Sequence, residues 1–411
     1  MRPVPHIARD KLKSNAQAWQ GCQMTAAQRI DPNAFVQLQE AATDKSRVVG
    51  LTHQFYRYPA RFSPQFAAKA VELFSNAGDL VLDPYMGGGT TIVEALAAGR
   101  RAVGNDLNEL SKFLVAVKTR PLTTDQIDEV HRWVKRALPK MNYRFDRSKI
   151  EHLVNTPQTY NLDLPSARPF KKAVAGAVLA LDRIKSRNAK AFARCVLLRL
   201  GQWQLDGRKN TPPLEAVRDK LQSLTDEMIQ GLRELDDVLK DKARPTLLCG
   251  DAGEIHQHRS FDDRKVDLVV TSPPYPGVHV LYHRWQINGR RETPAPYWLS
   301  HTNDGHGAAF YNFSDRRGAG LSKYFEVALR TLKSINAVMK PGSLLIQMVA
   351  FSDPNNHLPR YLETLETAGF SEIARPGNGR IWRDVPSRKW HANLKGETHS
   401  SREVVLIHRA N

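Results

Sequence analysis

Residues 271–275, TSPPY, have the clearest chemical potential in the sequence, because they follow directly on the apolar run VDLVV at residues 266–270. Proline cannot donate to a strand ladder, so regular structure ends here and nearby carbonyls lack ladder partners. The stretch therefore gathers a hydroxyl, free carbonyls and an aromatic ring at one strand end. Such a group can accept hydrogen bonds and stack on a planar ligand. A simple turn with a packed tyrosine is the alternative.

A second stretch with chemical potential is DPYMGGGTT at residues 83–91, which reads as a strand-to-helix turn. Its glycines allow close approach of a ligand, and a helix N-terminus offers free amides. The turn lacks the Gly-x-Gly-x-x-Gly spacing of a dinucleotide site and the lysine of a phosphate loop. Asp83 before the turn favours a ligand with amine or hydroxyl donors, such as the amino acid part of S-adenosylmethionine.

Two further acidic residues stand at strand ends. Asp106 closes the next expected strand and is placed to accept from two ribose hydroxyls, as acidic residues do in nucleotide-binding α/β folds. Asp251 closes the strand before TSPPY and is placed to meet an adenine amino group. Each could instead be an ordinary helix cap or turn aspartate. The recurrence of acidic residues at successive strand ends favours the nucleotide interpretation.

Alternating strands and helices would position these residues. The pattern predicts strands at 80–83 and 101–105 around a helix at 91–98, with a helix at 67–74 before them. Alternation stops after Asp106 and resumes with a strand that ends at Asp251 and with strands at 266–270 and 343–349. Helices at 324–339 and 360–368 and strands near Glu372 and 404–408 complete the pattern.

The chain accordingly divides into three parts. Residues 1–50 read as a polar N-terminal arm, 51–109 and 246–411 as the catalytic domain, and 110–245 as a helical insertion. Stretches such as AVAGAVLALDRIKSR and AFARCVLLRL predict the helices of the insertion. Parallel strands with interleaved helices indicate an α/β fold.

Composition indicates a polyanionic partner. The 411 residues include 60 Lys and Arg against 42 Asp and Glu, a formal charge of +18. This excess favours nucleic acid, although solvated basic faces also produce it. The three cysteines are widely spaced, so neither a disulfide framework nor a zinc knuckle is expected. Without a signal peptide or an apolar run of 18 residues, we expect a soluble, cytoplasmic protein.

The two motifs together resemble those of the amino DNA methyltransferases. LDPYMGGGTTIVEAL is similar to the cofactor motif of that family, TSPPY to its catalytic motif, and HQFYRYPARFSP at 53–64 to its element that closes over methionine. The order of these motifs resembles the unpermuted classes. The match covers residues 51–109 and 247–349 and leaves out the helical insertion.

This resemblance implies a Rossmann-like class I methyltransferase fold, with a mostly parallel seven-stranded sheet flanked by helices. It implies S-adenosyl-L-methionine as cofactor and no metal. The residues expected to bind the cofactor come from the closing element, the glycine turn and the strand ends: Tyr58, Pro59, Ala60, Arg61, Phe62, Asp83, Pro84, Tyr85, Gly87, Gly89, Thr90, Thr91, Asp106, Leu107, Asp251 and Ala252. The closing element could alternatively be a staple on the core.

The resemblance also implies methyl transfer to an exocyclic base amine, whose lone pair is delocalised into the ring. Ser272 Oγ and the Pro273 carbonyl would accept the amino hydrogens while the nitrogen attacks the methyl group in line. Tyr275 would stack on a base flipped from the duplex, and Pro274 completes the catalytic motif.

The serine of the motif sets the expected target. Ser-Pro-Pro-Tyr resembles enzymes acting on cytosine N4, whereas Asp-Pro-Pro-Tyr members mostly methylate adenine N6. Methylation at cytosine C5 is disfavoured because it needs a thiolate, commonly after proline, and Cys22, Cys195 and Cys249 follow Gly, Arg and Leu.

The segment after the motif mixes cations with aromatic rings, as a nucleic-acid surface requires. The expected DNA contacts are His279, Tyr282, His283, Arg284, Trp285, Arg290 and Arg291. A lid over the active site is the alternative for this segment, and a metal site at His279 and His283 is disfavoured. The basic helical insertion and the basic stretch at 378–402 are further candidates for DNA recognition.

We therefore expect a site-specific cytosine-N4 DNA methyltransferase that acts on double-stranded DNA. Adenine N6 is the nearest alternative target, and a catalytically silent nucleic-acid-binding relative is the alternative from another class. A cognate restriction endonuclease is a further candidate partner, and the oligomeric state is open.

Overall fold

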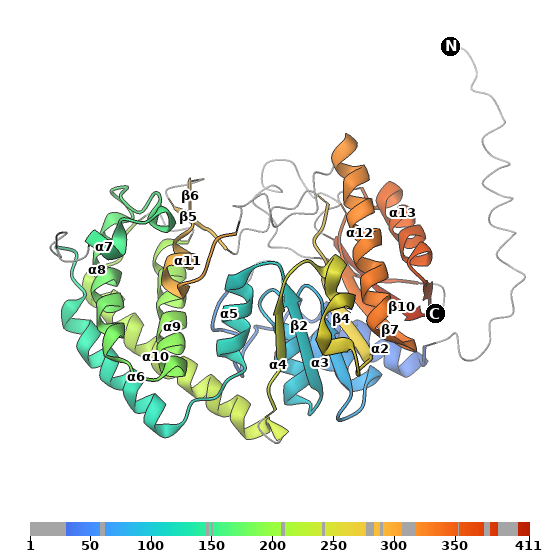
Figure 1. Ribbon diagram of the computed structural model, residues 1–411, viewed down its shortest axis with the longest axis horizontal. Helices are drawn as coiled ribbons and strands as arrows, with labels where there is room; N and C mark the ends of the chain where they lie inside the picture. The colour runs from blue at the N-terminus through green and yellow to red at the C-terminus, as the bar shows by residue number, and fades with distance from the viewer. Residues whose placement is uncertain are drawn as a thin grey trace, which may run out of the picture.

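The structure is a computed structural model that describes residues 30–57, 62–144, 148, 151–206, 210–240, 243–276, 283–287, 291–305, 318–351, 353–373, 379–384 and 402–411. It consists of an α/β unit built on one large sheet and a helical unit beside it (Figure 1). The glycine turn and TSPPY both belong to the α/β unit.

The large sheet has the strand order β3-β2-β1-β4-β7-β10-β8, and β9 also pairs with β10. Its strands are β1 (Leu80–Asp83), β2 (Arg101–Asp106), β3 (Thr246–Cys249), β4 (Val266–Thr271), β7 (Met339–Val349), β8 (Phe370–Glu372), β9 (Ile381–Asp384) and β10 (Arg402–Ala410). The pairs from β3 to β7 are parallel, whereas β10 is antiparallel to its partners. This confirms the class I methyltransferase fold; β9 adds a strand to the seven that were expected.

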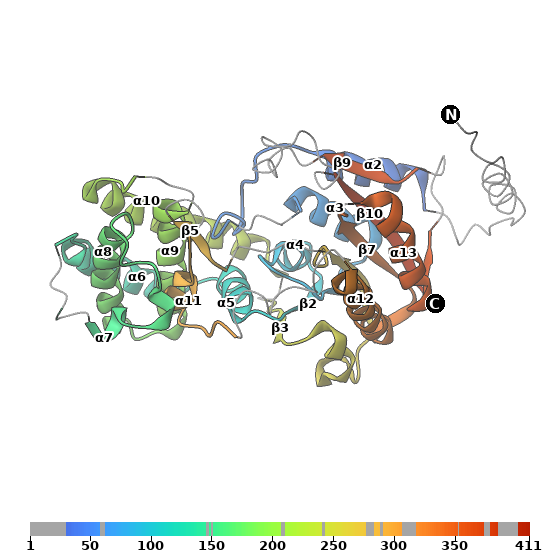
Figure 2. The same cartoon turned by 90° about the horizontal axis from the view of Figure 1, so that it is seen from above.

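Apolar alternation explains why these strands are covered on both faces. Leu80 and Leu82 lie in the core beneath α12 (Gly318–Val338) and α13 (Pro354–Thr367). Val81 between them lies in the opposite core, against α3 (Pro64–Phe74) and α4 (Thr90–Ala97). Successive side chains of a strand point to opposite faces, so each strand contributes to both cores. Figure 2 shows the helices on the two sides of the sheet.

Part of the expected N-terminal arm is a helix of the α/β unit. Asp31 caps α2 (Pro32–Thr43) by accepting from the Ala34 amide at 3.0 Å. Phe35 and Leu38 of this helix are buried in the sheet core. The expectation of an arm was therefore wrong for this segment, because the apolar face of α2 covers α3 and β9.

The helical unit has its own hydrophobic core. Its helices are α6 (Thr124–Ala137), α7 (Glu151–Val154), α8 (Arg168–Leu179), α9 (Arg187–Leu205) and α10 (Leu214–Val238), with single turns at η3 (Leu138–Lys140), η5 (Pro157–Thr159) and η6 (Ala180–Arg183). Trp133, Phe170 and Phe192 are buried there. The Trp133 indole also donates to the Ala177 carbonyl at 3.1 Å, so its one polar atom is satisfied.

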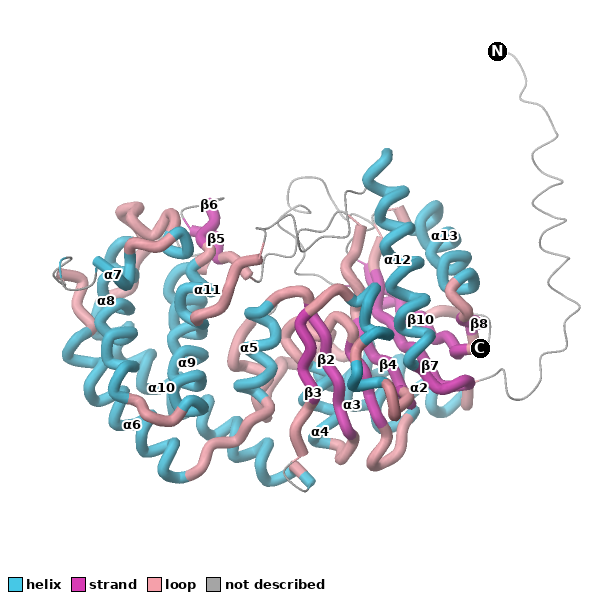
Figure 3. Tube along the Cα trace, viewed as in Figure 1, coloured by secondary structure: helices cyan, strands magenta, loops and turns pink. Residues whose placement is uncertain are grey.

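A segment from beyond TSPPY completes this helical core. The hairpin of β5 (Trp285–Ile287) and β6 (Arg291–Thr293), followed by α11 (Ala295–Ser300), packs on α9 (Figure 3). The α5 helix (Glu109–Lys118) joins the two units, because Leu114 lies in the helical core and Val115 in the sheet core. Within the described part of the chain, no helix is long and apolar enough to cross a membrane.

Candidate active site

The expected site residues meet where parallel strands end. Asp83 is the last residue of β1 and Asp106 the last of β2, while Ser272 directly follows β4. The Thr271 hydroxyl, at the end of β4, donates to Asp83 Oδ1 at 2.6 Å. The Gly250 amide after β3 donates to the Asp106 carbonyl at 3.1 Å. The sheet thus brings the glycine turn and the TSPPY motif side by side.

The glycine turn is held from several directions. Gly89, with φ of 72°, caps α4, and a Cβ at this position would lie 2.5 Å from Val115 Cγ2. The Ser111 hydroxyl donates to the Gly87 carbonyl at 2.6 Å, and Lys118 Nζ donates to the Gly88 carbonyl at 2.5 Å. Glycine is required here because α5 approaches the turn so closely.

Asp106 ties the turn to β2. Its Oδ2 accepts from the Gly87 amide and its Oδ1 from the Asn108 amide, both at 2.9 Å. Burial raises the pKa of this carboxyl to about 6. A carboxylate oxygen has a second lone pair, so these bonds leave acceptor capacity for a ligand.

Asp83 is the more strongly buried carboxyl. It accepts from the Tyr85 amide at 3.1 Å in addition to Thr271, and burial raises its pKa to about 7. The Thr91 hydroxyl donates to the Val270 carbonyl at 3.0 Å and so links α4 to β4. Two buried carboxyls with raised pKa values beside a glycine turn form an environment that favours a cationic ligand.

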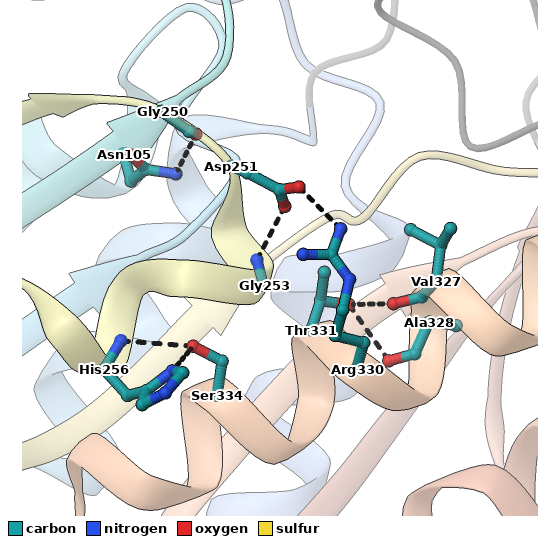
Figure 4. A network of polar contacts seen from close by, with 10 residues as sticks. All are labelled: Asn105, Gly250, Asp251, Gly253, His256, Val327, Ala328, Arg330, Thr331 and Ser334. Carbon is teal, nitrogen blue, oxygen red and sulfur yellow. Dashed lines mark hydrogen bonds and ion pairs between the residues drawn. The ribbon is translucent and has the colours of Figure 1, made fainter.

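Asp251 makes the helix-cap contact that the sequence left open as an alternative, together with an ion pair that the sequence did not indicate. It caps the short helix η8 (Ala252–Gln257) by accepting from the Gly253 amide at 2.8 Å. Its other oxygen accepts from Arg330 of α12 at 2.5 Å, and Figure 4 shows the two side chains facing each other. Both side chains are over a third exposed, so the ion pair adds little stability. A contact of Asp251 with adenine stays a prediction.

The remaining predicted cofactor residues lie around this edge. The Pro84 carbonyl accepts from the Asn105 side chain at 3.3 Å, and Tyr85 packs against the core beneath α12. Thr90 begins α4, Ala252 begins η8, and Leu107 directly follows β2.

TSPPY forms an elbow whose polar atoms are largely engaged. The hydroxyls of Ser272 and Tyr275 lie 3.0 Å apart, and the Tyr275 hydroxyl also reaches Glu403 Oε1 at 3.1 Å. The Pro274 carbonyl accepts from the Tyr324 hydroxyl at 3.2 Å. Tyr275 is only 7% exposed, whereas Ser272 is partly exposed. Stacking of the tyrosine ring on a base stays a prediction.

The closing element is anchored at both of its described ends. Residues 58–61 between them lie outside the described residues. These are the predicted cofactor contacts Tyr58, Pro59, Ala60 and Arg61. Phe62 is buried in the sheet core beside Phe66. On the other side, the Gln202 side chain accepts from the Arg57 amide and donates to the Arg57 carbonyl, both at 2.8 Å. The helical unit thus holds one end of this element.

Two of the residues predicted to contact DNA are buried. Trp285 is 1% exposed, and its indole donates to the Tyr56 hydroxyl at 2.9 Å. His283 is also buried, and burial lowers its pKa to about 3. Trp285 and Ile287 both point inward on β5, so they form the buried face of a hairpin. Neither Trp285 nor His283 is exposed to a base or phosphate.

Of the other residues predicted to contact DNA, one is paired with a carboxylate, one is exposed and three lie outside the described residues. Arg284 is bound by Asp304 at 2.6 Å, and Arg291 is exposed at the start of β6. His279, Tyr282 and Arg290 lie outside the described residues. In the insertion, the Arg194 guanidinium donates to the Leu299 carbonyl, so part of its basic character stabilises the helical unit internally.

Three residues that are distant in sequence from the motifs contact the site, and the sequence did not predict them. Glu403 contacts the TSPPY elbow, Gln202 the residue before the undescribed part of the closing element, and Arg330 contacts Asp251. No local motif marks them, since each acts across a strand or helix pairing. Among the described residues, no group of three His, Cys, Asp or Glu could hold a metal ion.

Part of this chain matches a family model. Residues 6–113 match a model described as DNA methylase, of the N6/N4 type. The chain is similar to Type II methyltransferase M.MvaI of Kocuria varians, with 26% identity over 251 residues that cover 55% of this chain and 53% of the relative. It is similar to Type II methyltransferase M.MthZI of Methanothermobacter thermautotrophicus, with 28% identity over 126 residues, 30% of this chain and 36% of the relative.

The chain therefore spans about half, or less, of the length of these relatives. Among solved structures, it is similar to TrmN from Thermus thermophilus, with a TM-score of 0.31 and 13% identity over 85% of this chain and 49% of that one. The rRNA methyltransferase aviRa from Streptomyces viridochromogenes has a TM-score of 0.30 and 10% identity, covering 86% of this chain and 89% of its own.

Proposed function

We propose that this chain, which is similar to DNA methylases over residues 6–113 and to Type II methyltransferases, transfers a methyl group from S-adenosylmethionine to the exocyclic N4 amine of cytosine in duplex DNA. One contact supports this most directly. The residue before the catalytic serine, Thr271, donates to Asp83 at the start of the glycine turn. A donor pocket and an amine-binding elbow would therefore share one rigid edge, which favours in-line transfer by proximity.

The residues present fit S-adenosylmethionine. Asp83 and Asp106 are buried acceptors beside a glycine turn, and their raised pKa values indicate that a ligand bearing cationic and hydroxyl donors would be favoured there. Asp83 and the glycine turn would hold the amino acid part, and Asp106 the ribose hydroxyls. The closing element at 58–62 would cover the methionine. When bound, the cofactor supplies an electrophilic methyl group on a positively charged sulfur.

The elbow would prepare the nucleophile. Ser272 Oγ and the Pro273 carbonyl accept the amino hydrogens, which orients the nitrogen lone pair toward the methyl group. With its hydrogens held by these two acceptors, the amine nitrogen would take the methyl group that bound S-adenosylmethionine would supply, and it would release one proton to water. Tyr275 would contact the flipped base.

Cytosine N4 is favoured over other positions for two reasons. Ser272 resembles the cytosine-N4 members, whereas an aspartate would favour adenine N6. Methylation at C5 requires a thiolate, and burial raises the pKa of Cys195 to about 12 and that of Cys249 above its usual value. These two described cysteines are therefore poor nucleophiles.

The test is methyl transfer from labelled S-adenosylmethionine to duplex DNA of mixed sequence, followed by digestion to nucleosides. We expect label in N4-methylcytosine. Label in N6-methyladenine would instead support the adenine alternative. DNA binding without any label in DNA would identify a silent relative and contradict the proposal. Sequencing modified DNA from cells that express the protein would give the target sequence.

A further inference from the structure

The Tyr275 hydroxyl lies among three oxygen atoms from different parts of the sheet. Ser272 Oγ is 3.0 Å away, the Met348 carbonyl of β7 3.2 Å, and Glu403 Oε1 of β10 3.1 Å. Glu403 is 4% exposed, and its other oxygen lies 2.8 Å from Nε of Arg383 on β9. A buried carboxylate with an arginine partner thus stands directly behind the catalytic elbow.

In the contact between Ser272 and Tyr275 either hydroxyl could be the donor, and the number of hydrogens limits the choice. A tyrosine hydroxyl has one hydrogen to donate, whereas a carboxylate and a carbonyl only accept. The carboxylate of Glu403 is the stronger acceptor and the nearer of the two, at 3.1 Å against 3.2 Å for the Met348 carbonyl, so the Tyr275 hydrogen is assigned to Glu403. The contact between Tyr275 and Ser272 then needs its hydrogen from the serine. Ser272 accordingly donates to Tyr275, and its hydrogen is directed away from the substrate side.

This direction matters because serine is otherwise both a donor and an acceptor. Facing an amino group, a hydroxyl that donated outward would oppose the amino hydrogens. An aspartate in the same place has no such ambiguity, since it only accepts. With its hydrogen engaged by Tyr275, Ser272 also presents only lone pairs to the amine.

We propose that Glu403 is a positioning residue that acts through Tyr275 to make Ser272 an acceptor for the target amine. The inference rests on the proposed function and holds whether the amine belongs to cytosine or adenine. It also gives the Tyr275 hydroxyl a role that stacking of its ring would not require. A purely structural Glu403 would only neutralise Arg383 between β9 and β10.

The test compares Glu403→Gln, Tyr275→Phe and the double variant in the full chain. Both changes preserve side-chain volume. We expect each single variant to lower kcat about tenfold or more, with the Kd for S-adenosylmethionine within about twofold of the wild type. Both substitutions act on one chain of hydrogen bonds. The kcat of the double variant should therefore be little lower than that of the less active single variant. The readouts are labelled methyl transfer, calorimetric cofactor binding and melting temperature.

The matched control is Glu372→Gln, since Glu372 of β8 also pairs with an arginine, Arg380, at 2.9 Å, but is absent from the elbow. It should leave kcat unchanged. A kcat for Glu403→Gln within twofold of the wild type, or losses that multiply in the double variant, would overturn the inference. If Glu403→Gln lowers the melting temperature strongly, Tyr275→Phe alone decides, and an unchanged kcat overturns the inference. Failure of the wild type to methylate DNA would instead count against the proposed function.

Discussion

The sheet edge and the helical unit bury different kinds of side chain. At the edge, the buried groups are polar and bind one another, as Asp83 does with Thr271 and Asp106 with the glycine turn. In the helical unit the large buried side chains are mainly aromatic, as with Trp133 and Trp285. Buried polar groups are costly unless they are hydrogen-bonded, so a cluster of them indicates a functional site. Buried aromatic rings contribute mainly to stability.

The two regions are nevertheless connected at specific points. The Asn108 side chain after β2 donates to the Tyr297 hydroxyl of α11 at 2.9 Å, and Gln202 holds Arg57 before the closing element. The helical unit thus supports the segments that border the site. We expect changes at the edge to reduce turnover and changes in the helical unit to reduce stability.

The largest expected effect is the loss of stability on Trp285→Ala. The ring packs so closely on α9 that a Cβ on Gly201 would lie 2.3 Å from it. Its removal should lower the free energy of unfolding by about 3–5 kcal/mol. Denaturant unfolding would measure this, with Trp285→Phe as the control that keeps most of the ring and should lose less. A variant of unchanged stability that no longer binds DNA would restore the base-contact interpretation.

The sequence predicted the residues at the sheet edge better than the residues that contact them from other helices and strands. Asp83, Asp106 and Ser272 each stand at the end of an expected strand, and parallel strands bring such residues to one edge, so local spacing was sufficient. Trp285 lies in the helical core instead of at a surface, and its type could not tell the two apart, because aromatic residues mark both hydrophobic cores and nucleic-acid surfaces. Glu403 lies 128 residues from Tyr275, and only the pairing of β10 with β7 brings it to the elbow.

The next largest effect is expected at the edge itself. Ser272→Ala removes the hydroxyl that we propose accepts from the amine, and loss of one such interaction costs about 10²–10³-fold in kcat. The Kd for S-adenosylmethionine and the melting temperature should stay close to those of the wild type. Single-turnover methyl transfer and calorimetry separate the two quantities. Full activity in this variant would remove Ser272 from the mechanism.

A pH dependence should follow from the raised pKa values of Asp83 and Asp106, about 7 and about 6 against about 3.9 in an unfolded chain. Between about pH 4 and pH 7 these two carboxyls bind more protons in the folded state than in the unfolded state. Their contribution to the free energy of unfolding is therefore fully present below about pH 4 and is lost as the pH rises to about 7. Cofactor binding favours the charged carboxylates and should reduce the dependence. Melting temperatures at several pH values would measure it. A steeper loss in Asp83→Asn than in the wild type would contradict the assignment.

The smallest effect is expected at Arg291, an exposed cation on the hairpin. If DNA lies along the edge that this hairpin borders, Arg291→Ala should weaken DNA binding a few-fold and reduce the slope of log affinity against log salt by about 1, with unchanged melting temperature. Lys185→Ala is the matched control, because Lys185 is also an exposed cation. It lies just before α9, far from the hairpin, which packs on the same helix at Gly201. At 1.5 Å per residue the two positions are about 24 Å apart along the helix. A larger salt effect at Lys185 than at Arg291 would place DNA along the far end of the helical unit and assign target recognition to the insertion.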